Sequence, residues 1–119
     1  AGGGFDDPVA MLIQDDSDAP AGPVNTTIGL VATDAHITKE DANYLARVSH
    51  DGLALTIRPC HTVRDGDTMF ALATGRNESR LDLTALGAAA VEVTAQAVLR
   101  AVRYATGLGG IPAISELAV

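Results

Sequence analysis

Two different rhythms of apolar and polar residues along the chain predict its strands and its helices. Residues 26 to 33 and 68 to 74 are mostly apolar, small or β-branched. Polar and apolar residues alternate too little there for one face to be exposed to solvent, which is typical of strands inside a sheet. Thr38 to about Thr56 carries apolar residues at helical spacing behind a capping hydroxyl. A longer helical pattern begins at Asp82 and is expected to end at Gly107.

The first 25 residues show neither the strand pattern nor the helix pattern over more than a few positions. Val9 to Ile13 predicts a short buried strand, and the polar stretch from Gln14 to Asn25, with its prolines and glycine, predicts a linker or exposed loop. The resulting order is strand, strand, helix, strand, helix, with small residues along the long helix. This order predicts a layered α/β sandwich whose two helices lie close against one sheet.

Length and composition place the chain among globular domains. Its 119 residues form one domain at most, with 47% hydrophobic and 19% charged residues. This is large enough for a real core but small for a complete enzyme with an enclosed site, so we expect a part of a larger protein. Aromatic residues make up only 3%, which leaves few side chains on which nucleic-acid bases could stack.

Charge is distributed unevenly. The net charge is -7, and the first 25 residues contain five aspartates and no lysine or arginine. Neither nucleic acid nor an anionic membrane is therefore expected as a partner. We find no apolar run near the length of a bilayer span and no secretory signal. The single cysteine, Cys60, fits a reducing compartment, so a cytoplasmic location is expected.

The junction Asn25-Thr26-Thr27, directly before the first long strand, has two interpretations. Asparagine is a turn residue and threonine is β-branched, so the junction could simply mark the start of a strand. Alternatively, Asn25-Thr26 is a self-cleavage site, and Thr26, once freed, is a nucleophile whose own α-amine serves as its base.

A second candidate for chemistry is Asp65-Gly66-Asp67, which leads into the second strand. Carboxylates at i and i+2 can point to the same side of a strand entrance, where they could orient an ammonium or an imidazole. The alternative is a polar turn built around Gly66. Asp65 and Asp67 do not form a recognised ligand spacing with His61, so neither a metal nor a cofactor is expected.

The three histidines, His36, His50 and His61, stand apart from any serine elbow or cysteine nucleophile motif. We therefore predict a surface or helix-packing role for each of them.

Three segments together carry a resemblance. NTTIGLVATDA, AHITKEDANYLARVSHDGLA and HTVRDGDTMFALATG resemble the β-subunit region of the DmpA-like peptidase family, which includes L-aminopeptidase/D-esterases, β-peptidyl aminopeptidases and the nylon-oligomer hydrolase. The similarity is strongest over residues 25 to 75 and continues more loosely to about residue 117. Its specificity depends on the Asn-Thr-Thr and Asp-Gly-Asp-Thr motifs occurring together.

The resemblance implies a role for each motif. In that family the nucleophile is the first residue of the β-subunit, exposed when the precursor cuts itself, and alignment on the ATDA segment puts it at Thr26. Asn25-Thr26 would then be the scissile bond. A free α-amine has a reference pKa of about 8, so near neutral pH a useful fraction can accept the hydroxyl proton. Asp65 and Asp67 would orient that amine and stabilise its protonated form.

The resemblance also indicates a branch of the family. The aminopeptidase branch has Ser-Gly-Glu where this chain has Asp65-Gly66-Asp67, whereas the nylon-oligomer hydrolase branch has Asp-Gly-Asp together with an N-terminal threonine. This chain resembles the second branch more closely. The implied substrates are peptide-like or 6-aminohexanoate-type oligoamides, hydrolysed through an acyl-Thr26 intermediate.

The same family implies an architecture and partners. The fold would be part of a layered α/β/β/α sandwich of the DmpA/ornithine acetyltransferase type. Residues 1–25 would be the tail of the α-subunit region with an acidic linker, and residues 26–119 would be the β-subunit. The missing α-subunit part of the same precursor would supply the oxyanion donors and much of the pocket, so activity would need it. A homo-oligomer of αβ units is expected.

Two other functions compete with this one. The chain could be a non-catalytic structural or interaction subunit, or an acyl transferase like the ornithine acetyltransferases, which share the fold and an N-terminal threonine. A binding module, however, has no reason to combine an Asn-Thr junction with a carboxylate pair about 40 residues later at the family's spacing.

Overall fold

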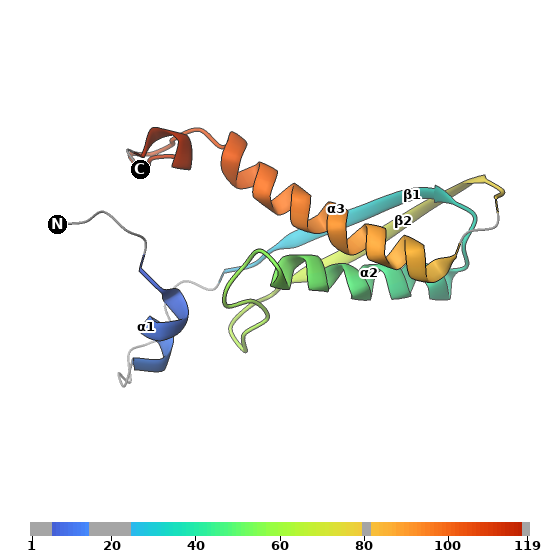
Figure 1. Cartoon of the computed structure of the whole chain (residues 1–119), viewed down its shortest axis with the longest axis horizontal. Helices are drawn as coiled ribbons and strands as arrows, with labels where there is room; N and C mark the ends of the chain where they lie inside the picture. Colours follow the sequence, from blue (N-terminus) through green and yellow to red (C-terminus); the bar gives the residue numbers. More distant parts are fainter. Residues whose placement is uncertain (1–5, 15–24, 80–81, 118–119) are drawn as a thin grey trace.

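The computed structural model describes residues 6–14, 25–79 and 82–117. The Gly-rich start and the acidic linker predicted after Gln14 lie outside these ranges. Along the chain, the elements are α1 (Pro8–Gln14), β1 (Ile28–Ala35), α2 (Lys39–Ala54), β2 (Thr68–Asn77), α3 (Leu83–Tyr104) and the short 3-10 helix η1 (Ile114–Glu116), as Figure 1 shows.

Strands β1 and β2 pair in parallel, which confirms the prediction that they are neighbours in one sheet. The register runs from Ile28 opposite Thr68 to Thr33 opposite Ala73, and it shifts before Ala35. Parallel strands cannot be joined by a tight turn, and α2 forms the crossover between them. Both strands consequently begin at the same edge of the sheet, so the residues just before Ile28 and just before Thr68 meet there.

One face of the sheet packs against α2 and contains the core. Val31 and Met69 point to this inner face and are buried with Leu45 and Leu53 of α2. Gly29 lies on the same face, and a Cβ atom there would collide with the Met69 side chain. The alternation of side chains along β1 therefore places Gly29 and Val31 on the face that α2 covers.

Helix α2 begins where its sequence predicts. The Thr38 hydroxyl accepts a hydrogen bond from the Asp41 N–H at 3.1 Å, and the Asp41 carboxylate accepts one from the Thr38 N–H at 3.1 Å. This capping box satisfies two backbone donors that a helix start otherwise leaves free.

Helix α3 packs mainly on α2 and only touches β1 (Figure 1). At the crossing, a Cβ atom on Gly52 would lie 2.6 Å from the Val91 carbonyl oxygen and 2.6 Å from the Thr94 Cβ. Gly52, which weakens an isolated helix, is here the residue that lets the two backbones approach. The prediction that both helices lie on the sheet is thus right for α2, whereas α3 is held chiefly through α2.

The prediction that no segment matches a membrane span in length was wrong for α3. Its 22 residues include an 18-residue window with a mean hydropathy of 1.4, so it is long and apolar enough to cross a bilayer by length and composition. A core helix of a globular domain meets the same criteria, and α3 does pack against α2, but only 22% of the window is buried in the described part of the chain.

The predicted strand from Val9 to Ile13 is also wrong, because this segment is helix α1. The Asp7 carboxylate accepts a hydrogen bond from the Val9 N–H at 3.0 Å, and Pro8 occupies the first helical position. An acidic cap followed by proline is a helix-start signal that outweighs the apolar run behind it.

The opposite, outer face of the sheet consists largely of exposed apolar side chains. Four of them are more than half exposed: Ile28 (73%), Leu30 (62%), Phe70 (55%) and Leu72 (52%). The observed arrangement of helices on one side of a parallel sheet agrees with the predicted α/β class. The second sheet and outer helix layer of the predicted sandwich remain a prediction.

Candidate active site

Thr26 lies at the edge of the sheet where both strands begin. The Gly66 N–H donates to the Asn25 carbonyl oxygen at 3.4 Å, and the Thr68 N–H donates to the Thr27 carbonyl oxygen at 2.8 Å. These bonds extend the β1–β2 pairing backwards, beyond the regular strands. The Asn25-Thr26 junction is therefore held against the Asp65-Gly66-Asp67 segment by backbone hydrogen bonds.

Gly66 faces the Thr26 hydroxyl directly. A Cβ atom at Gly66 would lie 2.8 Å from Thr26 Oγ1, closer than carbon and oxygen normally approach without bonding. A side chain at this position would therefore displace the hydroxyl. Its missing side chain leaves room for the hydroxyl that the sequence predicts to be the nucleophile.

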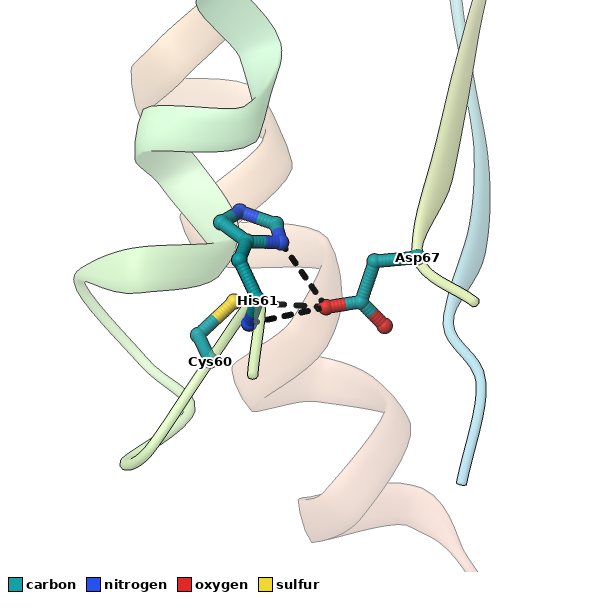
Figure 2. Close-up of side chains that lie close together, drawn as sticks. All are labelled: Cys60, His61 and Asp67. Atoms are coloured by element: carbon teal, nitrogen blue, oxygen red, sulfur yellow. Dashed lines mark hydrogen bonds and ion pairs between the residues drawn. The ribbon is translucent and has the colours of Figure 1, made fainter. Parts of the chain in front are cut away.

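Asp67 connects the two strand starts through both oxygens of its carboxylate. Oδ1 accepts a hydrogen bond from the Thr27 N–H at 2.9 Å. Oδ2 faces the loop before β2, where His61 Nδ1 lies 2.9 Å away, the His61 N–H 3.4 Å away and the Cys60 thiol 3.5 Å away, as Figure 2 shows. The Asp67 side chain is only 7% exposed, so this carboxylate has a fixed set of partners.

The same contacts determine the charge of the cluster. Burial alone would raise the pKa of the Asp67 carboxyl, but the hydrogen bonds from Thr27, Cys60 and His61 outweigh it and lower that pKa. Burial, together with the hydrogen bond to Asp67, raises the pKa of the Cys60 thiol to about 11. Asp67 is therefore ionised at neutral pH, and Cys60 remains a protonated donor.

Asp65 has a different role from Asp67. Its Oδ2 accepts a hydrogen bond from the Thr62 N–H at 2.7 Å, and its own N–H donates to the Thr62 carbonyl oxygen at 3.1 Å. These bonds close the turn that precedes Gly66. The structure thus brings Asp67 into contact with Thr27, the residue after Thr26, whereas Asp65 lines the same pocket and holds its own loop.

His61 is the site residue that sequence reasoning missed. Its side chain is 36% exposed, as the expectation of a surface position has it, and its ring also contacts Asp67. On its other side, the His61 ring meets His50 of α2 edge to face, with centroids 4.7 Å apart. The position of His61 in the same short loop as Asp67 was the available signal. His36 lies elsewhere, beside Gly75 and at a smaller hollow near Ile37.

Cys60, His61 and Asp67 are also the described residues closest to a metal-binding arrangement, with one possible ligand atom from each within 4.8 Å of the others. Their hydrogen bonds explain this proximity without an ion. The three residues form a hydrogen-bonded cluster around Asp67 Oδ2.

A pocket of about 640 Å³ opens in front of Thr26. Its walls combine apolar residues of α1 and of the segment after α2 with the charged loop: Pro8, Met11, Leu12, Asn25, Thr26, Thr27, Ile57, Arg58, Pro59, Thr62, Arg64, Asp65 and Asp67. Three threonines, two aspartates and two arginines are thus among the residues that line one space. Such a space is suited to a small polar substrate with an apolar stem.

Comparison with known proteins adds to this geometry. The model of peptidase family S58 matches residues 6–113. An uncharacterized aminopeptidase of Mycobacterium leprae is 45% identical over 79% of this chain and 30% of its own length, and one of Mycobacterium tuberculosis is 44% identical over 80% and 31%. A 6-aminohexanoate-oligomer endohydrolase of a Kocuria species is 38% identical over 66% and 25%. The chain spans less than a third of the length of these curated relatives.

Proposed function

Because the chain belongs to peptidase family S58, the DmpA family that its motifs predicted, we propose that it is the nucleophile-bearing part of a self-processing amide hydrolase. One observation carries the proposal. The Asn25-Thr26 junction lies against Asp65-Gly66-Asp67, and the Gly66 position leaves room for the Thr26 hydroxyl. A cleavable junction beside an ionised carboxylate and a pocket is the arrangement that an N-terminal nucleophile needs.

Self-cleavage comes first in this proposal. The Thr26 hydroxyl oxygen attacks the carbonyl carbon of Asn25, and the C–N bond between the two residues breaks. The result is an ester between Asn25 and the Thr26 side chain, with the former amide nitrogen now a free α-amine. Water then hydrolyses the ester, so that Asn25 ends in a carboxylate and Thr26 becomes an N-terminus with a free hydroxyl.

Turnover uses the same hydroxyl. The α-amine of Thr26 takes the hydroxyl proton while the oxygen attacks the amide carbon of the substrate, and the proton passes to the leaving amine. Water then hydrolyses the acyl-Thr26 ester. The negative charges of Asp65 and Asp67 favour the protonated α-amine. Asp67 also holds the start of the strand through the Thr27 N–H at 2.9 Å.

Substrates of this hydrolase are proposed to be peptides or 6-aminohexanoate-type oligoamides. The names of the similar proteins, aminopeptidase and 6-aminohexanoate-oligomer endohydrolase, support an amide bond as the target. The Asp-Gly-Asp sequence at 65–67 favours the oligoamide branch. Two arginines at the pocket, Arg58 and Arg64, add positive charge that suits a substrate with a carboxylate end.

We propose the α part of the same precursor as the partner that completes the enzyme. The outer face of the sheet, with Leu30 and Phe70 at 62% and 55% exposure, is apolar enough to form the inside of a second layer. The α part would cover this face and supply the oxyanion donors. A homo-oligomer of the resulting αβ units belongs to the same proposal.

The test compares Thr26 with its neighbour in the full-length protein. Thr26→Ala should leave one uncut chain without hydrolase activity, because alanine lacks the attacking oxygen. Thr26→Ser should retain some cleavage and some turnover, since it loses only a methyl group. Thr27→Ala is the matched control and should cut and turn over. Intact mass and hydrolysis of a generic amide substrate report the two steps.

A Thr26→Ala protein that still splits after Asn25, or that hydrolyses amides at the wild-type rate, would falsify the proposal. In that case a non-catalytic subunit, with Asn-Thr-Thr as a strand start, would be the better description.

A further inference from the structure

The two oxygens of Asp67 have separate functions in the structure. Oδ1 accepts from the Thr27 N–H at 2.9 Å, one residue from the predicted nucleophile. Oδ2 is taken up by the loop before β2, with His61 Nδ1 at 2.9 Å as its nearest partner. When one oxygen of a carboxylate is held by several partners, the group has little freedom to rotate about its Cβ–Cγ bond. The contacts to Oδ2 therefore fix the position of Oδ1.

The backbone of His61 is shaped for this contact. Its φ of 57° lies in the left-handed region, which is unusual for a residue other than glycine. In this conformation the ring nitrogen and the backbone N–H of the same residue both face Asp67 Oδ2, at 2.9 and 3.4 Å. Figure 2 shows both contacts converging on one oxygen. An unfavourable backbone conformation thus occurs where it allows one residue to make two contacts with the same carboxylate oxygen.

A second histidine supports the ring from behind. His50 Nδ1 lies 3.4 Å from His61 Nε2, and the His50 carbonyl oxygen lies 3.4 Å from the same nitrogen. His50 belongs to α2, which is capped and packed on the sheet. The line of contacts therefore runs from a capped and packed helix through His61 to Asp67 and on to Thr27, the residue after Thr26.

We propose that His61 is a positioning residue of the hydrolase, which fixes the Asp67 carboxylate so that Oδ1 holds the Thr27 N–H and the start of the Thr26 strand. This inference rests on the proposed function. His61 acts through Asp67 and does not touch the substrate.

The test measures kcat and KM of the full-length protein for His61→Ala and His61→Asn. Alanine removes the ring donor, and we expect kcat to fall about 10- to 100-fold with KM within about twofold. Asparagine can place its amide N–H near the position of Nδ1 and tolerates the left-handed backbone, so it should recover most of the rate. His36→Ala, at the other end of the sheet, is the matched control and should keep the wild-type rate.

A double-variant cycle separates positioning from general structural support. If His61 acts through Asp67, then His61→Ala should change kcat less than about twofold in an Asp67→Ala background. The rate of self-cleavage, followed by intact mass, gives a second reading of the same cycle. Where the double variant is too slow to measure, recovery by His61→Asn decides.

Three results would overturn the inference. They are an unchanged kcat in His61→Ala, no recovery in His61→Asn, and the same fold loss with and without the Asp67 carboxylate. Thr26→Ala in the same assay distinguishes the two proposals. If that variant is inactive while His61→Ala behaves as wild type, only the positioning role fails. If it remains active, the proposed function itself fails, and the positioning role with it.

Discussion

The starting edge of the sheet and its outer face contrast within the same two strands. At the edge, Asp67 has partners on both oxygens and its side chain is 7% exposed. On the outer face, Ile28 and Leu30 are 73% and 62% exposed. The contrast teaches that the described residues hold the start of the sheet with a fixed set of contacts, whereas its outer face is exposed, and this is the face on which the proposed α part would dock.

The largest effect should come from a charge on the outer face. Phe70→Asp in the full-length protein should lower the free energy of unfolding by about 3–5 kcal/mol, because a carboxylate would be buried where an aromatic ring belongs. Denaturant unfolding of the purified protein measures this loss. Asn43→Asp adds the same charge at an exposed position of α2, so it is the control and should change little. Equal, small effects of the two substitutions would mean that the outer face stays in water.

The next largest effect is expected on kcat, from substitution of the two carboxylates at the starting edge of the sheet. Asp67→Asn should lower kcat about 10- to 100-fold, because it removes the charge that binds the Thr27 N–H, whereas Asp65→Asn should lower it less, because Asp65 bonds within its own loop. Steady-state kinetics of both full-length variants test the order. A larger loss at Asp65 would reverse the assignment of the two side chains.

The pH dependence of stability follows from the same site. The pKa of Asp67 is lowered in the folded state, so its contribution to stability is present above its unfolded value of about 3.9 and is lost as the pH falls through the folded value. The difference in unfolding free energy between wild type and Asp67→Asn should therefore be greatest near neutral pH and shrink below about pH 4. A difference that stays constant down to pH 2 would show that the charge of Asp67 is not what matters.

The smallest effect should come from Gly66→Ala. The added Cβ would lie 2.8 Å from Thr26 Oγ1, so the hydroxyl has to rotate or shift by a few tenths of an ångström. We expect a loss of about tenfold in kcat, in line with the sensitivity of catalysis to small misplacements, with a melting temperature close to that of wild type. Gly75→Ala tests a different glycine, whose left-handed φ of 66° should make the substitution affect stability instead.

Local signals predicted much of the fold. The Thr38 cap, the two long strands and the helix from Asp82 followed from hydroxyl, carboxylate and apolar spacing, because each depends on residues a few positions apart. The proximity of Asp67 to Thr26 required the added knowledge that the strands are neighbours.

Other features depended on contacts that spacing does not encode. The role of Gly52 in packing follows from where α3 crosses α2, and the contact of His61 with Asp67 follows from a left-handed residue in a loop. Helix α1 could have been predicted, since Asp7 and Pro8 are a start signal, but its apolar run has the length of a strand. These features depend on a tertiary contact or on a helix cap, and the apolar pattern alone contains neither.

The parallel register has a consequence for how the chain tolerates insertions. Ile28 is paired with Thr68, and Thr26 lies two positions and Asp67 one position before this pair of residues. One extra residue between either side chain and the pair would displace that side chain by about 3.3 Å, the rise of a strand, and turn it to the opposite side. Insertions should therefore be rejected between Thr26 and Ile28.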